Sequence, residues 1–567
     1  AQAIFVQARL MAPPSRASMM GCLGRQAWVV AVCVAFALIS GVGAELWDVA
    51  RLRGVPIVSF DGTRLSADAH VPRSTRPGER FPVVVFANSW ACPEFEYLVE
   101  TVKLAELGYL VLEYQTRGFY LSGGHVEAAG PEDLRDQSAV ISYALGRLDW
   151  HPDPARIALV GISYGGGLAL LGAAHDPRVV TAISMSGWPN LERALFENSS
   201  PNLVWGDILV GSGEITGRLD PLIPRMWKHV REGDEAAFHD FAMSRSVVTH
   251  ADVLKARRVP LLLSNNLEDR LFKPQDMLDF FATYTGPKKM LLNQGIHATA
   301  EIGGLLDIPN NHVWVEVKKW LGRWLKGDAT HDDTLVEVQL RSNPRIHECF
   351  TEWPSQRIGR LEYVMSPRGA FGIHGALIPS GEVAPVGASG VTQESITFSE
   401  KTGLSIGLPV VGEVLQVFFD KRIESNLLFT PRSHTIWYYA PVSGQKRVCG
   451  TPELSIDIES NSGQWQLVAY LFSVNFLSQG TLISHGSLTC WNCTASQRMT
   501  RRIELRTLCE DVSGGLGLAF SLYSAVYQPA NTSPGLAMTF HYSGDFSLVV
   551  PQLLDGVHDK DLQEVIV

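Results

Sequence analysis

The sequence predicts an α/β domain with a mostly parallel sheet, followed by an all-β domain. Continuous apolar runs alternate with helical periodicity from residue 81 to residue 327, which is typical of buried strands and the helices that cover them. Short alternating segments separated by turn residues follow from residue 337 onward. The length of 567 residues, with 46% hydrophobic content, also exceeds what a single core holds.

The first part of the α/β domain is predicted to be a hairpin, two buried strands and a helix. Asp61-Gly62 joins the hairpin strands, because this dipeptide favours the tight turn between paired strands. The helix lies between the two buried strands and ends at Gly108. The predicted strands cover residues 55–60, 64–72, 81–89 and 109–114, and the helix covers residues 96–107.

The second part contains another helix, four strands, an insertion and a closing helix. Pro131 opens the helix, and Glu132 and Asp133 in its first turn suit the helix dipole. Residues 189–257 lack strand character and lie where the α/β-hydrolase fold, which this order resembles, carries a helical cap. The strands cover residues 157–160, 179–188, 259–266 and 288–293, and the closing helix covers residues 312–327. We interpret the cap aromatics first as cap core and second as a substrate lining: Phe196, Trp205, Trp227, Phe238 and Phe241.

The β-rich remainder is expected to be a β-sandwich or jelly roll. Residues 367–392 are rich in glycine and proline and predict a long loop within it. We place the α/β domain at residues 45–328 and the β domain at residues 329–567. The predicted strands cover residues 337–341, 435–440, 454–460, 465–474, 502–506, 516–526 and 537–542.

The N-terminal 44 residues read as a secretory leader. Residues 27–42 are apolar but short for a spanning helix, Arg16 and Arg25 precede them, and Val42-Gly43-Ala44 resembles a cleavage site. We therefore expect a secreted or extracytoplasmic protein that starts near Glu45. The alternative is an uncleaved signal anchor, which would attach the protein to a membrane.

Composition limits the partners and cofactors. The net charge of −10 is mild and there is no long basic stretch, so we expect neither nucleic acid nor an anionic membrane as the main partner. Six of the eight cysteines follow the leader, which permits disulfides in an exported chain. Cys490 and Cys493 have half the spacing of a zinc site but no second pair, which favours a disulfide or a thiol. We predict no metal and no organic cofactor.

Residues 156–174 carry the most informative local pattern. The apolar run Ile157 to Val160 breaks at Gly161-Ile162-Ser163-Tyr164-Gly165, and a helical run of small residues follows. This strand, sharp turn and helix predict a nucleophile elbow, which exposes a serine hydroxyl at the edge of the sheet. Glycine flanks the serine because a Cβ atom would collide across so tight a turn. The alternative is a glycine-rich turn without chemistry.

Partners for Ser163 occur in the order that an elbow serine requires. A serine hydroxyl needs a base to take its proton, and the base needs an acid to orient it. After the strand that follows the cap come Glu268 and Asp269, and four residues after Asn293 comes His297. We predict Ser163 as nucleophile, Asp269 as acid and His297 as base. His312 is the next candidate base but falls inside the closing helix.

The negative charge that develops on a substrate oxygen needs fixed donors. One should be the backbone N–H of Tyr164, directly after the nucleophile. The second should come from the loop after residues 81–89, where we name Ser89 and Trp90 as backbone candidates. Trp90 is equally well a packing residue. Arg117 is interpreted first as part of a structural ion pair and second as a substrate ligand.

Several motifs together resemble the Xaa-Pro dipeptidyl-peptidase-like hydrolases, the group that includes cocaine esterase and glutaryl-acylase-type enzymes (CocE/NonD hydrolases). The catalytic-domain motifs are YQTRGFYLSGG with GPEDLRDQ, then GISYGGG, NNLEDRLF and NQGIHA, and CGTPELSIDIESNSGQWQLVAYLF looks like the entry to the family's jelly roll. The resemblance covers residues 50–550. It implies a serine hydrolase that cleaves an ester or amide through an acyl-enzyme, with Ser163, Asp269 and His297 in the roles predicted above. The cocaine-esterase branch has a tyrosine oxyanion donor after the third strand, where this chain has Asn88-Ser89-Trp90.

We therefore expect a hydrolase acting on a small ester, an amide or a short peptide. The first rival is an Xaa-Pro dipeptidyl-peptidase, which would need acidic groups to hold a free N-terminus. The second is a binding or adhesion protein with a dead hydrolase domain. The substrate, the disulfide pairing and the oligomeric state do not follow from the sequence.

Overall fold

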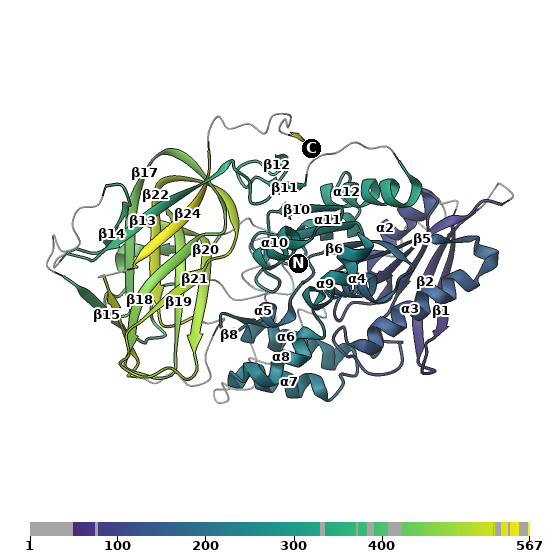
Figure 1. The fold of residues 1–567 in the computed structure, drawn as a ribbon, viewed down its shortest axis with the longest axis horizontal. Coiled ribbons are helices and arrows are strands. Elements are labelled where there is room, and N and C mark those ends of the chain that lie inside the picture. Colours follow the sequence, from purple (N-terminus) through teal and green to yellow (C-terminus); the bar gives the residue numbers. More distant parts are fainter. Residues whose placement is uncertain are drawn as a thin grey trace, which may run out of the picture.

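The computed structural model describes residues 49–566 apart from 74–77, 329–334, 370–371, 383–390, 406–421, 525–526, 528–534, 543–544 and 555–564. An α/β domain with a cap lies beside a β domain (Figure 1). The predicted leader, residues 1–44, lies outside the described residues, so the signal peptide and the location that it implies stay predictions. Within the described residues, no helix is long and apolar enough to cross a membrane.

The α/β domain is built on an eleven-stranded sheet with the strand order β1-β2-β4-β3-β5-β6-β9-β10-β11-β12-β25. β1 and β2 form the predicted antiparallel hairpin, and the strands from β4 to β11 pair in parallel. The strands are β1 (Val49–Val58), β2 (Arg64–Pro72), β3 (Phe81–Ala87), β4 (Leu110–Tyr114), β5 (Pro152–Ile162), β6 (Val179–Met185), β9 (Leu261–Asn266), β10 (Lys288–Asn293), β11 (Val336–Gln339), β12 (Ile346–Phe350) and β25 (Val565–Ile566).

Both faces of this sheet are covered by helices, which explains the continuous apolar runs of the central strands. In β3, Val83 and Val85 join one buried cluster and Val84 and Phe86 join the other, because successive side chains point to opposite faces. The first cluster includes residues of α3, α4 and α10, and the second includes residues of α2, α11 and α12. The helices are η2 (Glu94–Tyr97), α2 (Leu98–Glu106), α3 (Pro131–Gly146), η3 (Leu148–Trp150), α4 (Tyr164–His175), α10 (Pro274–Thr283), α11 (Thr299–Leu305), α12 (His312–Leu321) and η5 (Gly322–Lys326).

The predicted cap between residues 189 and 257 is mainly helical. It also contains a short antiparallel pair that the sequence did not signal, β7 (Phe196–Glu197) with β8 (Ser200–Pro201). Figure 1 shows α6, α7 and α8 along the lower edge of the α/β domain. The cap helices are α5 (Leu191–Leu195), α6 (Leu203–Thr216), α7 (Leu222–Glu232), α8 (Glu235–Met243), η4 (Val247–His250) and α9 (Ala251–Arg257).

The predicted start of the β domain at residue 329 is too early. β11 pairs in parallel with β10, and β12 pairs antiparallel with β11, so both strands extend the first sheet. Apolar and polar residues alternate over residues 337–341, which suggested that this strand belongs to the second domain. Its pairing with β10 instead places it in the first sheet. The second sheet begins with β13 (Ile358–Ser366).

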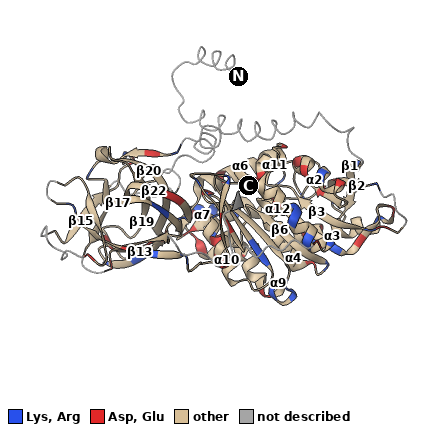
Figure 2. Ribbon diagram, turned by 90° about the horizontal axis from the view of Figure 1, so that it is seen from above, with Lys and Arg blue, Asp and Glu red and all other residues tan. Residues whose placement is uncertain are grey.

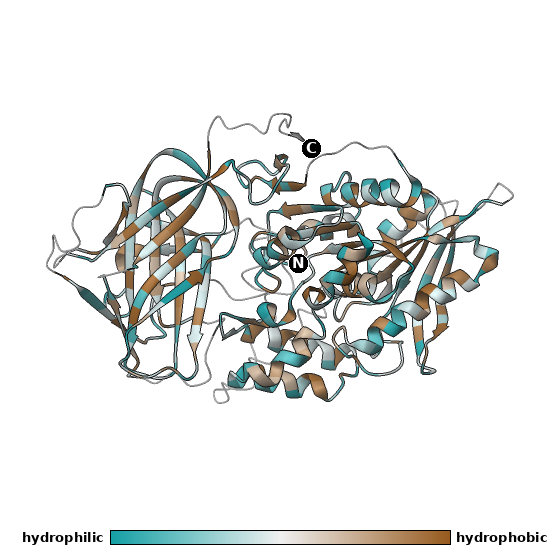
Figure 3. Ribbon diagram, in the orientation of Figure 1, coloured by the Kyte–Doolittle hydropathy of each residue, from teal (hydrophilic) through white to brown (hydrophobic). Residues whose placement is uncertain are grey.

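The β domain is a twelve-stranded, mostly antiparallel sheet that buries clusters on two sides. Figure 3 shows hydrophobic residues alternating with hydrophilic ones along its strands. The predicted loop at residues 367–392 is interrupted by a strand, and the finer jelly-roll arrangement stays a prediction. Besides β13, the elements are β14 (Gly375–Pro379), β15 (Gln393–Thr397), β16 (Glu424–Asn426), η6 (Leu427–Phe429), β17 (Thr435–Gly450), β18 (Glu453–Ser460), β19 (Trp465–Val474), β20 (Gln479–Cys490), β21 (Met499–Glu504), β22 (Leu508–Ser521), β23 (Ala537–His541) and β24 (Ser547–Leu553).

Two disulfides lie in the β domain. Cys449 and Cys509 are directly opposite one another on β17 and β22, and they are bonded. Cys490 and Cys493 are bonded to each other, so of the two predicted states, a disulfide or a thiol, the pair adopts the disulfide. Acidic and basic residues are interspersed over both domains, in keeping with the mild net charge (Figure 2).

Candidate active site

Ser163 occupies the sharp turn between β5 and α4, with φ 55° and ψ −114°. This left-handed backbone is unfavourable for a residue with a Cβ, so strand and helix must hold it. The flanking glycines explain how the turn closes. A Cβ on Gly161 would lie 2.3 Å from the carbonyl carbon of Gly165, and one on Gly165 would lie 2.2 Å from the carbonyl oxygen of Ala87. The predicted elbow geometry is present.

Ser163, His297 and Asp269 form one hydrogen-bonded chain. His297 Nε2 lies 2.8 Å from Ser163 Oγ, and His297 Nδ1 lies 2.7 Å from Asp269 Oδ2. The acid follows β9 and the histidine follows β10, so the carboxyl ends of three parallel strands bring the groups together. Asp269 is fully buried, and the His297 side chain is 12% exposed. This arrangement can pass a proton from the serine hydroxyl to an oriented imidazole.

Glu268 and Asp269 point in different directions. The second carboxylate oxygen of Asp269, Oδ1, accepts hydrogen bonds from the N–H groups of Leu271 and Phe272, at 2.8 and 3.0 Å. Glu268 instead contacts Arg341, at 3.4 Å. The structure therefore places only Asp269 at the histidine, as the spacing predicted.

A buried carboxylate, that of Glu301, holds the helix after the His297 loop against the sheet, and no sequence pattern predicted it. Glu301, on α11, accepts hydrogen bonds from Ser186 Oγ at 3.1 Å, Ser264 Oγ at 2.9 Å and Asn266 Nδ2 at 2.9 Å. This network joins the ends of β6 and β9 to the helix that follows His297. Its members come from distant segments, and the one available signal was an acidic residue four positions after His297.

The prediction of Ser89 as a backbone donor for the substrate oxygen is wrong. The Ser89 N–H donates to Glu96 Oε2 at 2.7 Å, and its hydroxyl donates to Glu96 Oε1 at 2.6 Å. Trp90 and Tyr164 both line the pocket at Ser163. Tyr164 is the first residue of α4, where an N–H has no partner within the helix. The indole N–H of Trp90 donates to the carbonyl of Leu209, so this ring also anchors the cap.

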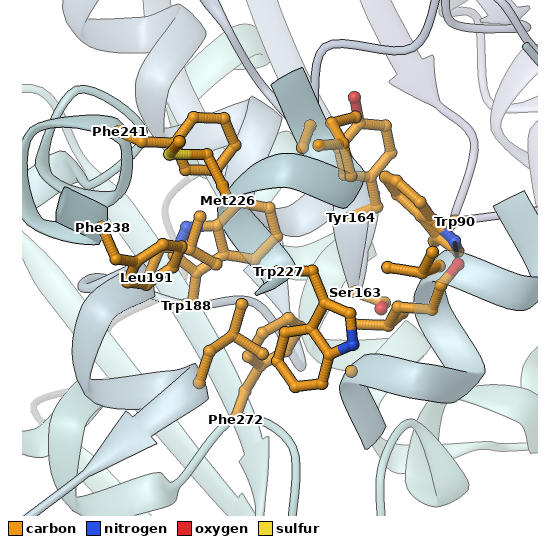
Figure 4. A pocket seen from close by; sticks show the side chains of 16 residues that line it. Trp90, Ser163, Tyr164, Trp188, Leu191, Met226, Trp227, Phe238, Phe241 and Phe272 are labelled. Atoms are coloured by element: carbon orange, nitrogen blue, oxygen red, sulfur yellow. Dashed lines mark hydrogen bonds between the residues drawn. The ribbon is translucent and has the colours of Figure 1, made fainter. Parts of the chain in front are cut away.

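A pocket with an almost wholly apolar lining opens beside Ser163 (Figure 4). Its volume is about 90 Å³. Three of the five cap aromatics that we interpreted first as cap core, Trp227, Phe238 and Phe241, line this pocket. Their role as a substrate lining stays a prediction. Among the described residues, no carboxylate is part of the lining, which consists of Trp90, Ala128, Ser163, Tyr164, Trp188, Leu191, Leu195, Gly206, Leu209, Val210, Ile223, Met226, Trp227, Phe238, Phe241 and Phe272.

Two buried ionisable groups behind the pocket have structural partners. The hydroxyl of Tyr164 donates to Asp133 Oδ2 at 2.9 Å, and burial raises the pKa of Asp133 to about 7. Arg117 is 2% exposed and donates two hydrogen bonds to Asp136, both of 2.7 Å. Arg117 is thus held in a structural ion pair, which was the first of its two interpretations.

The β domain reaches the loop of the acid through Arg506, which lies between β21 and β22. Arg506 is buried, and its Nη1 donates to the backbone oxygen of Asp269 at 2.5 Å. Its Nη2 lies 3.2 Å from Glu197 of the cap and 2.9 Å from the hydroxyl of Tyr527. Burial opposes the charge on Arg506, but Tyr527 and Glu197 raise its pKa above the usual value. The β domain, the cap and the loop that carries Asp269 therefore meet at the buried guanidinium of Arg506.

Replacing Arg506 with methionine should destabilise this junction. The change leaves Glu197 buried with Lys273, which lies 3.3 Å away, and removes the donor to the Asp269 carbonyl. Breaking a buried ion pair costs about 3 kcal/mol or more. We expect a correspondingly lower midpoint of urea unfolding. Arg360→Met is the control, because Arg360 pairs with Glu453 on the surface, and equal losses in both variants would contradict the role of Arg506.

The comparisons with known proteins agree with the predicted resemblance. Residues 61–299 match the model of the X-Pro dipeptidyl-peptidase (S15) family, and the match includes Ser163, Asp269 and His297. This part of the chain is similar to a family of hydrolases, so the expectation of an enzyme of that class is confirmed. The match ends before the closing helix and the β domain.

Solved structures extend the likeness over both domains at the level of the fold. A CocE/NonD family hydrolase from Staphylococcus aureus is 12% identical, with 89% of this chain and 94% of that chain covered at a TM-score of 0.65. An α-amino acid ester hydrolase is 13% identical, with coverage of 90% and 98% and a TM-score of 0.66. An aminopeptidase from a marine sediment Thaumarchaeota archaeon is 12% identical, with coverage of 91% and 99% and a TM-score of 0.64. The chain thus has an α/β-hydrolase-like fold with a C-terminal β domain.

Proposed function

We propose that the chain is a serine hydrolase that cleaves an ester or amide bond through Ser163, His297 and Asp269, with an acyl-enzyme intermediate. The observation that carries the proposal is the continuous hydrogen-bonded chain from Asp269 through His297 to Ser163, at the edge of an apolar pocket. The match of residues 61–299 to a hydrolase family supports the same reaction class.

In the first half of the reaction, His297 Nε2 takes the proton of Ser163 Oγ as the oxygen attacks the carbonyl carbon of the substrate. Asp269 accepts from Nδ1–H, which keeps Nε2 as the proton acceptor and stabilises the imidazolium. The tetrahedral oxyanion accepts from the backbone N–H groups of Tyr164 and Trp90. His297 then donates its proton to the leaving alcohol or amine, and the acyl group stays on Ser163.

In the second half, a water molecule replaces the leaving group. His297 takes a proton from the water while its oxygen attacks the acyl carbon. Collapse of the second tetrahedral intermediate returns this proton to Ser163 Oγ and releases a carboxylic acid. The reaction therefore consumes one water and leaves the chain unchanged.

Labelling with a fluorophosphonate tests the proposal and its rival, a binding protein with a dead hydrolase domain. We expect the phosphorus to bond to Ser163 Oγ with loss of fluoride, which mass spectrometry of a peptide containing Ser163 detects. The Ser163→Ala chain should stay unlabelled. A wild-type chain that is folded but unreactive would favour the binding protein.

The pocket favours a neutral acyl group over the free N-terminus of a dipeptide. Holding a buried ammonium requires a carboxylate, because an unpaired buried charge is costly. Two cap acids outside the lining have other partners: Glu192 contacts His239 at 2.8 Å, and Asp207 accepts from the indole N–H of Trp227 at 2.8 Å. Glu197 is paired with Lys273 and Arg506. A cavity of about 90 Å³ suits a short acyl chain, since about 150 Å³ holds a benzene molecule.

We therefore expect p-nitrophenyl butyrate to be cleaved with a higher kcat/KM than Ala-Pro-p-nitroanilide. The reason is that burying the dipeptide's ammonium beside Trp227, Phe238 and Phe241 has no compensating ion pair. Steady-state assays on both substrates measure the preference. A tenfold preference for the Ala-Pro substrate that vanishes on acetylation of its amine would instead identify an Xaa-Pro dipeptidyl-peptidase.

A further inference from the structure

Two histidines and a glutamate converge near one end of the first sheet, and none of them lines the pocket at Ser163. His312 begins α12, Glu337 lies on β11 and His347 lies on β12. One ligand atom from each lies within 4.8 Å of the others. From the sequence, His312 is only an alternative base, and the cysteine spacing predicts no zinc site. Three elements that are separate in the chain create this cluster.

We propose that His312, Glu337 and His347 bind a late first-row divalent cation, for which zinc is the probe. Imidazole nitrogens with a carboxylate oxygen are a common zinc donor set, and a water would complete four-fold coordination. The inference does not depend on the proposed hydrolase reaction.

The spacing of the ligand atoms fits a small cation after a minor adjustment. His312 Nε2 lies 2.8 Å from Glu337 Oε2, and His347 Nδ1 lies 3.7 Å from the same oxygen. Ligands about 2.1 Å from a tetrahedral zinc ion are roughly 3.4 Å apart. The two separations from Glu337 Oε2 lie on both sides of this value, and the ligand nitrogens of the two histidines lie within 4.8 Å of each other.

The environment of His347 indicates a site that lacks its ligand, because the hydrogen bonds of this side chain are incomplete. This residue is 1% exposed, and its Nε2 has no hydrogen-bond partner among the described residues. Its Nδ1 is beyond hydrogen-bond distance from Glu337. The ring stands edge-on to His312, with the ring centroids 4.0 Å apart. A buried ring nitrogen whose nearest partner is 3.7 Å away is unfavourable, and a cation held between His347 Nδ1 and Glu337 would give that nitrogen a partner.

The surroundings orient the carboxylate and allow entry. Lys289 Nζ lies 2.6 Å from Glu337 Oε1, which leaves Oε2 directed at the histidines. Glu316 lies 2.7 Å from the same ammonium, so the positive charge of Lys289 is balanced. Such outer partners commonly hold ligating carboxylates in place. A groove of about 380 Å³ between the His297 loop and α12 reaches His312 from the surface.

Zinc titration of the full-length, tag-free chain tests the proposal. After removal of metals with EDTA, we expect calorimetry and elemental analysis to give one zinc per chain and a higher melting temperature with zinc. His312→Gln and His347→Gln should each weaken binding by about 100-fold or more, because even indirect partners of a metal cost 10- to 100-fold. His239→Gln is the control, since His239 also contacts a glutamate but belongs to no three-ligand cluster within the described residues.

Two further measurements test whether zinc binds at this cluster and not at the candidate active site. The His297→Ala chain should retain the zinc, which separates this cluster from the candidate active site. If His347→Gln does not fold, the wild-type chain with Co²⁺ should still show the visible absorption of a tetrahedral site, and His312→Gln should lose it. Absence of zinc uptake by the wild-type chain, or uptake that survives His312→Gln, would leave only a hydrogen-bonded His–Glu pair and overturn the proposal.

Discussion

The Ser163→Ala chain should hydrolyse p-nitrophenyl butyrate about 10⁴-fold or more slowly than the wild type, because the triad members act as a unit. His297 keeps its contact with Asp269 in this variant but has no hydroxyl to activate. The fold should persist, since alanine removes only one oxygen and keeps the Cβ that the φ of 55° already accommodates. Steady-state rates with matching circular dichroism spectra measure the effect.

A serine outside the pocket provides the matched control for that variant. Ser142 lies on the exposed side of α3, where it donates to the carbonyl of Ser138 and accepts from Arg178 on the surface. Ser142→Ala should therefore keep wild-type rates. Near-native turnover by folded Ser163→Ala protein would place the nucleophile elsewhere and remove the basis of the proposed function.

Local patterns were enough to predict the elbow and the order of its partners. Gly161 is needed because a Cβ there would collide with Gly165 within the same turn, which is a local constraint. Gly165 is needed for a second reason, because a Cβ there would collide with Ala87 of β3. Asp269 and His297 follow from strand order, since parallel strands deliver their carboxyl ends to one edge. The parallel strands themselves were visible as continuous apolar runs, because helices cover both faces of the sheet.

Interactions between distant segments explain what the sequence did not show. Ser89 has the right position for a donor, but Glu96 occupies its N–H from the next helical turn. Arg506 meets the Asp269 carbonyl across 237 residues of chain. The strand at residues 336–339 alternates like those of the β domain, yet pairing with β10 assigns it to the first sheet. A pattern within one segment of the sequence cannot predict these contacts, because each depends on a second segment that is distant in the chain.

Asp269→Asn should lower kcat by about 10⁴-fold, whereas Glu268→Gln should leave kcat within a few-fold of the wild type. The asparagine side chain must present its oxygen to the N–H groups of Leu271 and Phe272, which now donate to Asp269 Oδ1. Its amide nitrogen then faces His297 Nδ1 as a donor, so the proton of the neutral imidazole moves to Nε2. An Nε2 that carries a proton cannot accept the one from Ser163.

Glu268 provides the control for this substitution because it is the adjacent carboxylate and contacts Arg341 instead of the histidine. Both variants remove one negative charge from the same loop, so a general electrostatic effect would slow them equally. Comparison of kcat for the two variants on one ester, with melting temperatures to confirm folding, separates the possibilities. A greater loss in Glu268→Gln than in Asp269→Asn would reject Asp269 as the acid, because only the residue that fixes the tautomer of His297 can have the larger effect.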